Sequence, residues 1–134
     1  MFDLTKPMDI NWELNNICNL MCPQCARNEV KNGILQWNQD DNTLNDSDTT
    51  LEDFKIAFNN IGNVGTVRFY GNISENVASK DFAKICEFIL DKGSHVMVST
   101  NGSLRTTDWW KKLGNIYERD KESKVAFCLD GLRE

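Results

Sequence analysis

Four short segments rich in β-branched and aromatic residues alternate with helical patterns along the chain, and this alternation most constrains the fold. Polar or glycine-containing segments interrupt each apolar run, as is typical of short strands. Because strands separated by helices pair in parallel through right-handed crossovers, we expect an α/β fold with a parallel sheet. The predicted strands cover residues 8–14, 66–70, 95–100 and 124–130.

Three helices are predicted between these strands. The first begins with the capping-box pattern Ser/Thr-x-x-Asp/Glu at Thr50 and extends to about Asn60. The second is amphipathic and stops before Gly93, and the third begins with Thr107 as its N-cap residue. The segment 36–50 is rich in Asn, Asp and Thr and is predicted to be a loop. The second and third predicted helices cover residues 79–92 and 107–113.

Three cysteines, Cys18, Cys22 and Cys25, directly follow the first predicted strand. Their C-x3-C-x2-C spacing places three thiolates in one short loop, and soft thiolates select iron–sulfur clusters, zinc or copper(I). A closed structural zinc site requires four ligands, whereas a cubane cluster on three thiolates keeps one iron open. The triad therefore favours a cluster with an open iron, and hence chemistry at the metal.

Zinc with a fourth ligand from elsewhere is one alternative for the triad. His95, the one histidine of the chain, begins a strand and is expected at the opposite edge of the sheet from the cysteines. A disulfide is disfavoured because clustered cysteines in a reducing compartment are usually metal ligands or catalytic groups, and the total of five cysteines is odd. The other two, Cys86 and Cys128, are predicted to be small core residues, and the position of Cys128 at the end of a strand leaves a functional role as its alternative.

Composition excludes several classes of function. With 134 residues, the chain is expected to form a single domain, 1–134. Its formal net charge of −5, without a cluster of Lys and Arg, argues against nucleic acid and anionic membranes as partners. No apolar run reaches the roughly 18 residues of a membrane span, and the N-terminus lacks a signal-peptide pattern, so we expect a cytoplasmic location. The acidic stretch 40–48 lacks the Gly and Glu spacing of a calcium loop.

Polar motifs follow the other predicted strands as well. Residues 71–76 follow the second strand, residues 99–102 end the third, and Asp130 ends the fourth. Because the C-terminal ends of parallel strands share one edge, where ligands bind in α/β sheets and barrels, we expect these motifs to lie beside the cysteines. Each motif also has a simpler interpretation as a turn or a helix cap.

With these motifs the chain resembles the radical S-adenosylmethionine (radical SAM) enzymes. The C-x3-C-x2-C loop after the first strand is the defining signature of that superfamily. The tripeptides Trp-Glu-Leu at 12–14 and Cys-Asn-Leu at 18–20 also resemble the sequences that the family has around this signature. The resemblance extends from about Asn11 to Arg133. It is closest to short members related to the branch with a C-terminal auxiliary-cluster (SPASM-type) domain.

The resemblance implies a [4Fe–4S] cluster on Cys18, Cys22 and Cys25, with SAM chelating the fourth iron. One electron from the cluster would cleave SAM to methionine and a 5′-deoxyadenosyl radical, which abstracts hydrogen from an unknown substrate. The SPASM-type branch suggests a peptide as that substrate, and flavodoxin or ferredoxin would be the reductant. The resemblance implies no catalytic residue beyond the cluster ligands.

The resemblance also assigns SAM contacts to the strand-end motifs. Residues 71–76 stand where the family has a Gly-Gly-Glu-Pro-like motif that binds the SAM amino group, with Glu75 at the acidic position. Residues 99–101 match the motif that contacts the ribose or carboxylate, and the sequence around Asp130 resembles Ser-Ile-Asp-Gly near SAM. The implied SAM-binding residues are Gly71, Asn72, Ser74, Glu75, Ser99, Asn101 and Asp130.

The chain departs from the family pattern in length. The family core is a six-stranded partial (β/α) barrel, whereas this chain carries about four βα units with parallel strands and no auxiliary-cluster cysteines. The expected fold is thus a shortened barrel core, which a partner chain could complete. Two alternatives to an active enzyme are a non-catalytic iron–sulfur and SAM-binding module and an inactive remnant. The remnant is favoured by Ser74 and Asn76, where Gly and Pro are more usual.

Overall fold

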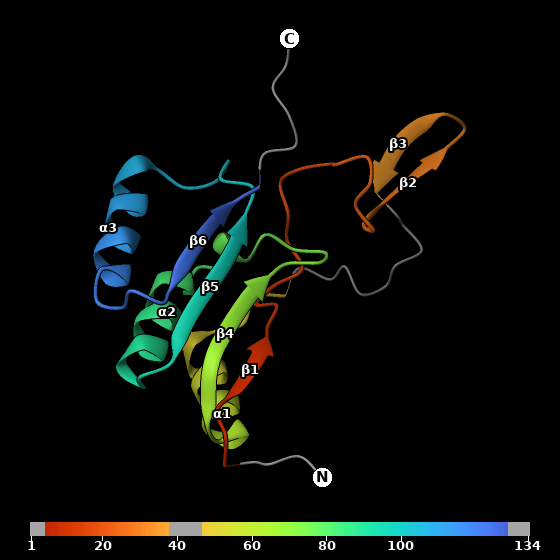
Figure 1. Cartoon of the computed structure of the whole chain (residues 1–134). Coiled ribbons are helices and arrows are strands. Elements are labelled where there is room, and N and C mark those ends of the chain that lie inside the picture. Colours follow the sequence, from red (N-terminus) through yellow and green to blue (C-terminus); the bar gives the residue numbers. More distant parts are fainter. Residues whose placement is uncertain (1–4, 38–46, 129–134) are drawn as a thin grey trace.

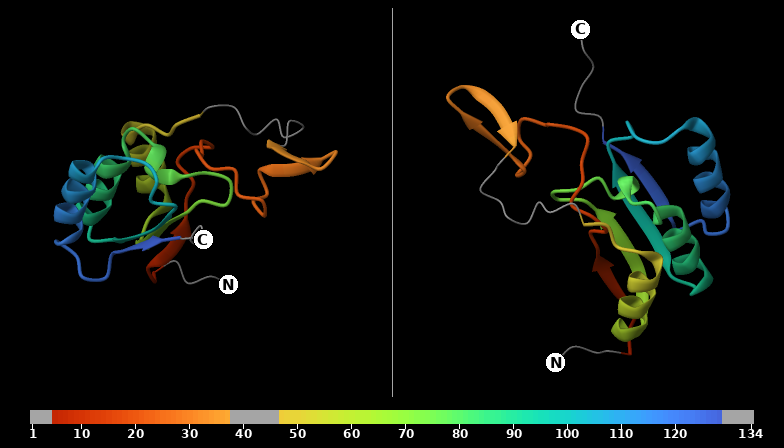
Figure 2. Two further views of the ribbon diagram at one scale, coloured as in Figure 1. Left: turned by 90° about the horizontal axis from the view of Figure 1, so that it is seen from above. Right: turned by 180° about the vertical axis from the view of Figure 1, so that it is seen from behind.

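The computed structural model describes residues 5–37 and 47–128 (Figure 1). Its centre is a four-stranded parallel sheet with the strand order β1-β4-β5-β6. The three α-helices lie on one face of this sheet (Figure 2). The predicted α/β fold with parallel strands is therefore confirmed, but these four strands form an open sheet and do not establish a barrel.

The strands agree with the sequence prediction except at their ends. The first strand ends before Leu14, because the N–H of Leu14 donates to Asn76 Oδ1 at 2.7 Å instead of to a neighbouring strand. The second begins two residues earlier than the predicted Thr66, and the last two residues of the fourth predicted strand lie outside the described residues. The sheet strands are β1 Met8–Asn11, β4 Val64–Tyr70, β5 His95–Thr100 and β6 Lys124–Phe127.

The helices are α1 Leu51–Ile61, α2 Phe82–Asp91 and α3 Thr107–Tyr117. A short 3-10 helix, η1 Asn76–Ala78, precedes α2, which therefore starts later than predicted. The predicted N-cap of the third helix was wrong by one residue, because the Thr106 hydroxyl accepts the N–H of Trp109 at 3.3 Å. No helix among the described residues is long and apolar enough to cross a membrane.

A β-hairpin that the sequence analysis did not predict follows the cysteine loop. Its strands, β2 Asn28–Lys31 and β3 Ile34–Trp37, pair antiparallel around Asn32 and Gly33, which both have positive φ. An Asn-Gly pair favours this type I′ turn. Part of the segment 36–50 is thus strand rather than loop, and the hairpin projects away from the sheet (Figure 2).

The hydrophobic core lies between the sheet and its helices. The ring of Phe69 on β4 lies 6.3 Å from that of Phe54 on α1, and both side chains are fully buried. Cys86 on α2 belongs to this core, as predicted, and burial raises the pKa of its thiol to about 12. Trp109 and Trp110 on α3 pack against the same core.

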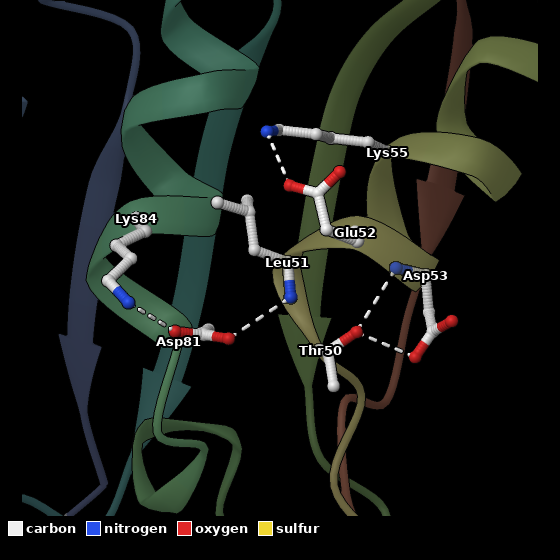
Figure 3. A network of polar contacts seen from close by, with 7 residues as sticks. All are labelled: Thr50, Leu51, Glu52, Asp53, Lys55, Asp81 and Lys84. Atoms are coloured by element: carbon white, nitrogen blue, oxygen red, sulfur yellow. Dashed lines mark hydrogen bonds and ion pairs between the residues drawn. The ribbon is translucent and has the colours of Figure 1, made fainter.

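A polar network joins the first turns of α1 and α2 (Figure 3). The Thr50 hydroxyl accepts the N–H of Asp53 at 3.2 Å, which is the predicted helix cap. Asp81 accepts the N–H of Leu51 at 3.1 Å through one carboxylate oxygen and pairs with Lys84 at 2.7 Å through the other. The hydrogen bond from Lys84, and then that from Leu51, lowers the pKa of Asp81. The Asp81 carboxylate therefore links the two helices and satisfies a first-turn N–H group.

We expect the free energy of unfolding to decrease less steeply with falling pH in Asp81→Asn than in the wild type. Because the pKa of Asp81 is lowered in the folded chain by Lys84 and Leu51, the unfolded chain binds this proton more strongly and acid favours unfolding. The stabilisation is complete above the unfolded pKa of about 3.9 and is lost as pH falls through the folded pKa. Urea unfolding between about pH 6 and pH 3 measures the effect.

The matched control for this prediction is Asp108→Asn, because the Asp108 side chain on α3 is 85% exposed. Some pH dependence will persist in Asp81→Asn, since the hydrogen bond from Arg68 also lowers the pKa of Asp9. A variant curve as steep as that of the control would contradict the assignment of this effect to Asp81.

Candidate functional site

A pocket at the C-terminal edge of the sheet brings together the cysteines and the strand-end motifs. Cys18, Cys22 and Cys25 line it, together with residues 71–75 and 99–101. These segments meet because the strands before them are parallel and end at the same edge (Figure 1). Asp130 lies outside the described residues. The predicted SAM-binding residues that line the pocket are Gly71, Asn72, Ser74, Glu75, Ser99 and Asn101.

The cysteine loop is shaped by its own backbone and by the start of the hairpin. The N–H of Cys25 donates to the Cys22 carbonyl at 3.0 Å, and Asn28 Nδ2 donates to the same carbonyl at 2.8 Å. All three cysteines of the triad are partly exposed. Within residues 5–37 and 47–128, no three His, Cys, Asp or Glu side chains form a group that could hold a metal ion.

The donor set fits a cubane cluster better than a single ion. A zinc ion needs four ligands at about 2.0–2.3 Å from one point, and no three such side chains converge in this way among the described residues. His95 does not complete that set, because it begins β5 at the end of the strand away from the pocket and its Nδ1 lies 2.9 Å from Asp120 Oδ2. In a cubane cluster each thiolate binds a different iron, so the thiolates need not converge on a single point. Three cysteine thiols around one pocket are therefore a suitable donor set for such a cluster.

The loop after β4 makes a tight turn at Gly71. A Cβ atom at this position would lie 1.9 Å from the Ser74 carbonyl oxygen, so only glycine fits the turn. The Glu13 carboxylate accepts the N–H of Asn72 at 2.5 Å and lies 3.5 Å from the Ser74 hydroxyl. Glu13 lies in the segment before the cysteines, and its carboxylate therefore holds the loop that forms one wall of the pocket. The sequence indicated Glu13 only as part of the family-like tripeptide at 12–14.

Arg27 joins the cysteine loop to the same wall. Its Nη1 donates to the Asn16 carbonyl at 2.5 Å and to the Ile73 carbonyl at 2.7 Å. The residue is only 9% exposed. Arg27 comes two residues after Cys25, the last cysteine of the triad, and belongs to no helical or strand pattern. Its role therefore could not be predicted from the sequence.

Asn101 is held by a ring of side-chain hydrogen bonds beside the cysteines. Its Nδ2 donates to Asn19 Oδ1 at 3.1 Å, and its Oδ1 accepts from the Ser103 hydroxyl at 2.6 Å. Asn19 Nδ2 in turn donates to the Ser103 hydroxyl at 2.8 Å. The loop after β5 is thus fixed to the cysteine loop at Asn19, the residue after Cys18.

Cys128 lies at the pocket and is exposed, so its predicted place in the core was wrong. Side chains alternate along β6, and Val125 is the residue that packs against the core. Cys128 lies three residues after Val125, so its side chain is on the opposite face of the sheet from the core. There its Sγ lies 2.9 Å from the Ser99 hydroxyl. A fourth thiol therefore lines the pocket beside the triad.

The whole chain is similar to a curated protein. It is 24% identical over 133 residues to the Fe-coproporphyrin III synthase of Methanosarcina barkeri (strain Fusaro / DSM 804), a radical SAM-type enzyme. The match covers 99% of this chain but 30% of the relative, so the chain spans less than a third of the relative's length. No family model and no solved structure matches the chain. The match confirms the resemblance to the radical SAM superfamily as a distant relationship.

Proposed function

We propose that this chain is the core of a radical SAM enzyme, which binds a [4Fe–4S] cluster on Cys18, Cys22 and Cys25 and SAM in the adjoining pocket. The observation that carries the proposal is the convergence of the cysteine loop with the loops after β4 and β5. The distant radical SAM-type relative supports the same superfamily. When bound, the cluster and SAM supply the electron transfer that cleaves the sulfonium and starts hydrogen abstraction from a substrate.

The residues of the chain itself shape the pocket and keep it open. Gly71 lets the backbone turn tightly against the Ser74 carbonyl, and Glu13 holds the loop that follows Gly71. Arg27 fixes that loop to the cysteine loop through two carbonyl groups. The residues proposed to contact SAM are Gly71, Asn72, Ser74, Ser99 and Asn101, all of which line the pocket, and Asp130 by resemblance.

The reductant, the substrate and a partner chain are part of the same proposal. A one-electron donor such as flavodoxin or ferredoxin would reduce the cluster, and a peptide is the proposed substrate class. Among the described residues β6 has β5 as its one neighbouring strand, so its outer edge offers unpaired backbone groups. A partner strand added there would extend the sheet toward a barrel.

Anaerobic reconstitution of the chain with iron and sulfide tests the proposal. We expect the reduced protein to show the EPR signal of a [4Fe–4S] cluster, and we expect SAM to change that signal because it occupies the open iron. A cluster signal that is identical with and without SAM would contradict SAM binding. A chain that binds zinc under the same conditions and assembles no cluster would contradict the assignment of the triad.

A further inference from the structure

We propose that Glu75 is a positioning residue that joins the loops on either side of the SAM pocket, rather than a ligand of the SAM amino group. The inference rests on the proposed function, because it concerns the same pocket. It differs from the role that the family resemblance implies for this residue.

Both oxygens of the Glu75 carboxylate are used by the backbone of the chain. Oε2 accepts the N–H of Asn101 at 2.8 Å, and Oε1 accepts the N–H of Val77 at 3.4 Å. The first bond has the length of a charge-assisted hydrogen bond. Glu75 is only 4% exposed, so these bonds compensate the burial of its charge.

The backbone of Glu75 extends this connection to the cysteine loop. Its N–H donates to the Ile17 carbonyl at 2.7 Å, and its carbonyl accepts from Asn15 Nδ2 at 3.3 Å. One residue therefore contacts the segment that leads to Cys18, the start of η1 and the first residue after β5. The Glu75 side chain makes the connection to Asn101. Because β5 ends at Thr100, the Asn101 N–H lies beyond the strand, and it donates to the Glu75 carboxylate.

Replacement by glutamine separates the two roles. Glutamine keeps a carbonyl oxygen for the Asn101 N–H but loses the negative charge that an ammonium group would need. If Glu75 were the SAM ligand, Glu75→Gln would weaken SAM binding about tenfold or more, because a charge-assisted bond is lost. For a positioning residue we expect SAM affinity to stay within about threefold in Glu75→Gln.

Replacement by alanine removes the acceptor itself. The Asn101 N–H then loses its acceptor, and this first residue after β5 is no longer joined to the start of η1, so SAM affinity should fall more than about tenfold. Arg105 still joins the later part of the loop to η1 through the Val77 and Ala78 carbonyls. The same change should abolish the slow hydrogen exchange of the Asn101 amide in the protein without cluster, whereas Glu75→Gln should keep it.

The experiment combines amide hydrogen exchange of the metal-free chain with SAM titration of the reconstituted chain. Glu52→Gln is the control, because Glu52 is a glutamate on the surface of α1 with a 75% exposed side chain. Equal losses of SAM affinity in Glu75→Gln and Glu75→Ala, with Asn101 exchange unchanged in both, would overturn the inference. If the wild-type chain bound neither cluster nor SAM, the proposed function would fail. The exchange of Asn101 would still show whether Glu75 holds this loop.

Discussion

Cys22→Ala is expected to abolish assembly of the proposed [4Fe–4S] cluster. The triad supplies three thiolates, and the substitution would leave the proposed cluster with two protein ligands from the cysteine loop. Iron and sulfide analysis after anaerobic reconstitution, together with the visible absorption of the cluster, measures the loss. We expect the same result for Cys18→Ala and Cys25→Ala.

The fold should survive these substitutions, which makes the result interpretable. Cys22 is partly exposed, so its truncation should change the free energy of unfolding of the metal-free chain by about 0.5 kcal/mol or less. Cys128→Ser is the matched control, because Cys128 is an exposed thiol that lines the same pocket. A full complement of iron in Cys22→Ala, or loss of the cluster in Cys128→Ser, would show that the ligand set is assigned wrongly.

Gly71→Ala is expected to disrupt the pocket and to destabilise the chain. The new Cβ would lie 1.9 Å from the carbonyl oxygen of Ser74 and 2.9 Å from its carbonyl carbon, so the backbone of the loop must move. Forcing extra atoms into a packed site typically costs about 1–3 kcal/mol, and here the displaced backbone is also the pocket wall. Urea unfolding and SAM titration should therefore both show a loss.

Gly114→Ala controls for a general effect of replacing glycine. An added Cβ at Gly114, inside α3, meets nothing within 4 Å, and its φ is not positive. Because alanine is the better helix former, we expect this variant to gain about 0.5–1 kcal/mol of stability. If Gly71→Ala unfolded and bound SAM like the wild type, the tight turn at Gly71 would not be required.

Local patterns were sufficient for the parallel sheet and most helix starts. The strand 95–100 was predicted with its observed bounds, because a short run rich in β-branched residues lies between turn residues at Gly93 and Asn101-Gly102. The helix at Thr50 was predicted because a capping box is complete within four residues. Each of these signals is contained in a few neighbouring residues and needs no distant partner.

The errors arose where a local pattern allowed two arrangements. Thr106 and Thr107 are both good N-caps, and only the backbone geometry selects the first. The Asn32-Gly33 pair is a local signal for a type I′ turn, so the hairpin follows from two neighbouring residues. Cys128 was placed in the core from its apolar neighbours, although the alternation of side chains from Val125 puts it on the other side of the sheet.

The sequence by itself determined the spacing of the three cysteine thiols and the edge of the sheet at which the motifs meet. The thiol spacing and the alternation of strands with helices are each contained in short segments of the chain, and parallel strands bring their C-terminal ends to one edge. Only the tertiary structure decided which polar side chains brace the pocket. Glu13 bonds to Asn72, Arg27 to Ile73 and Glu75 to Asn101, and the partners lie 59, 46 and 26 residues apart. A buried charged group takes the hydrogen-bond partner that the packed chain brings to it, and no local pattern encodes that choice.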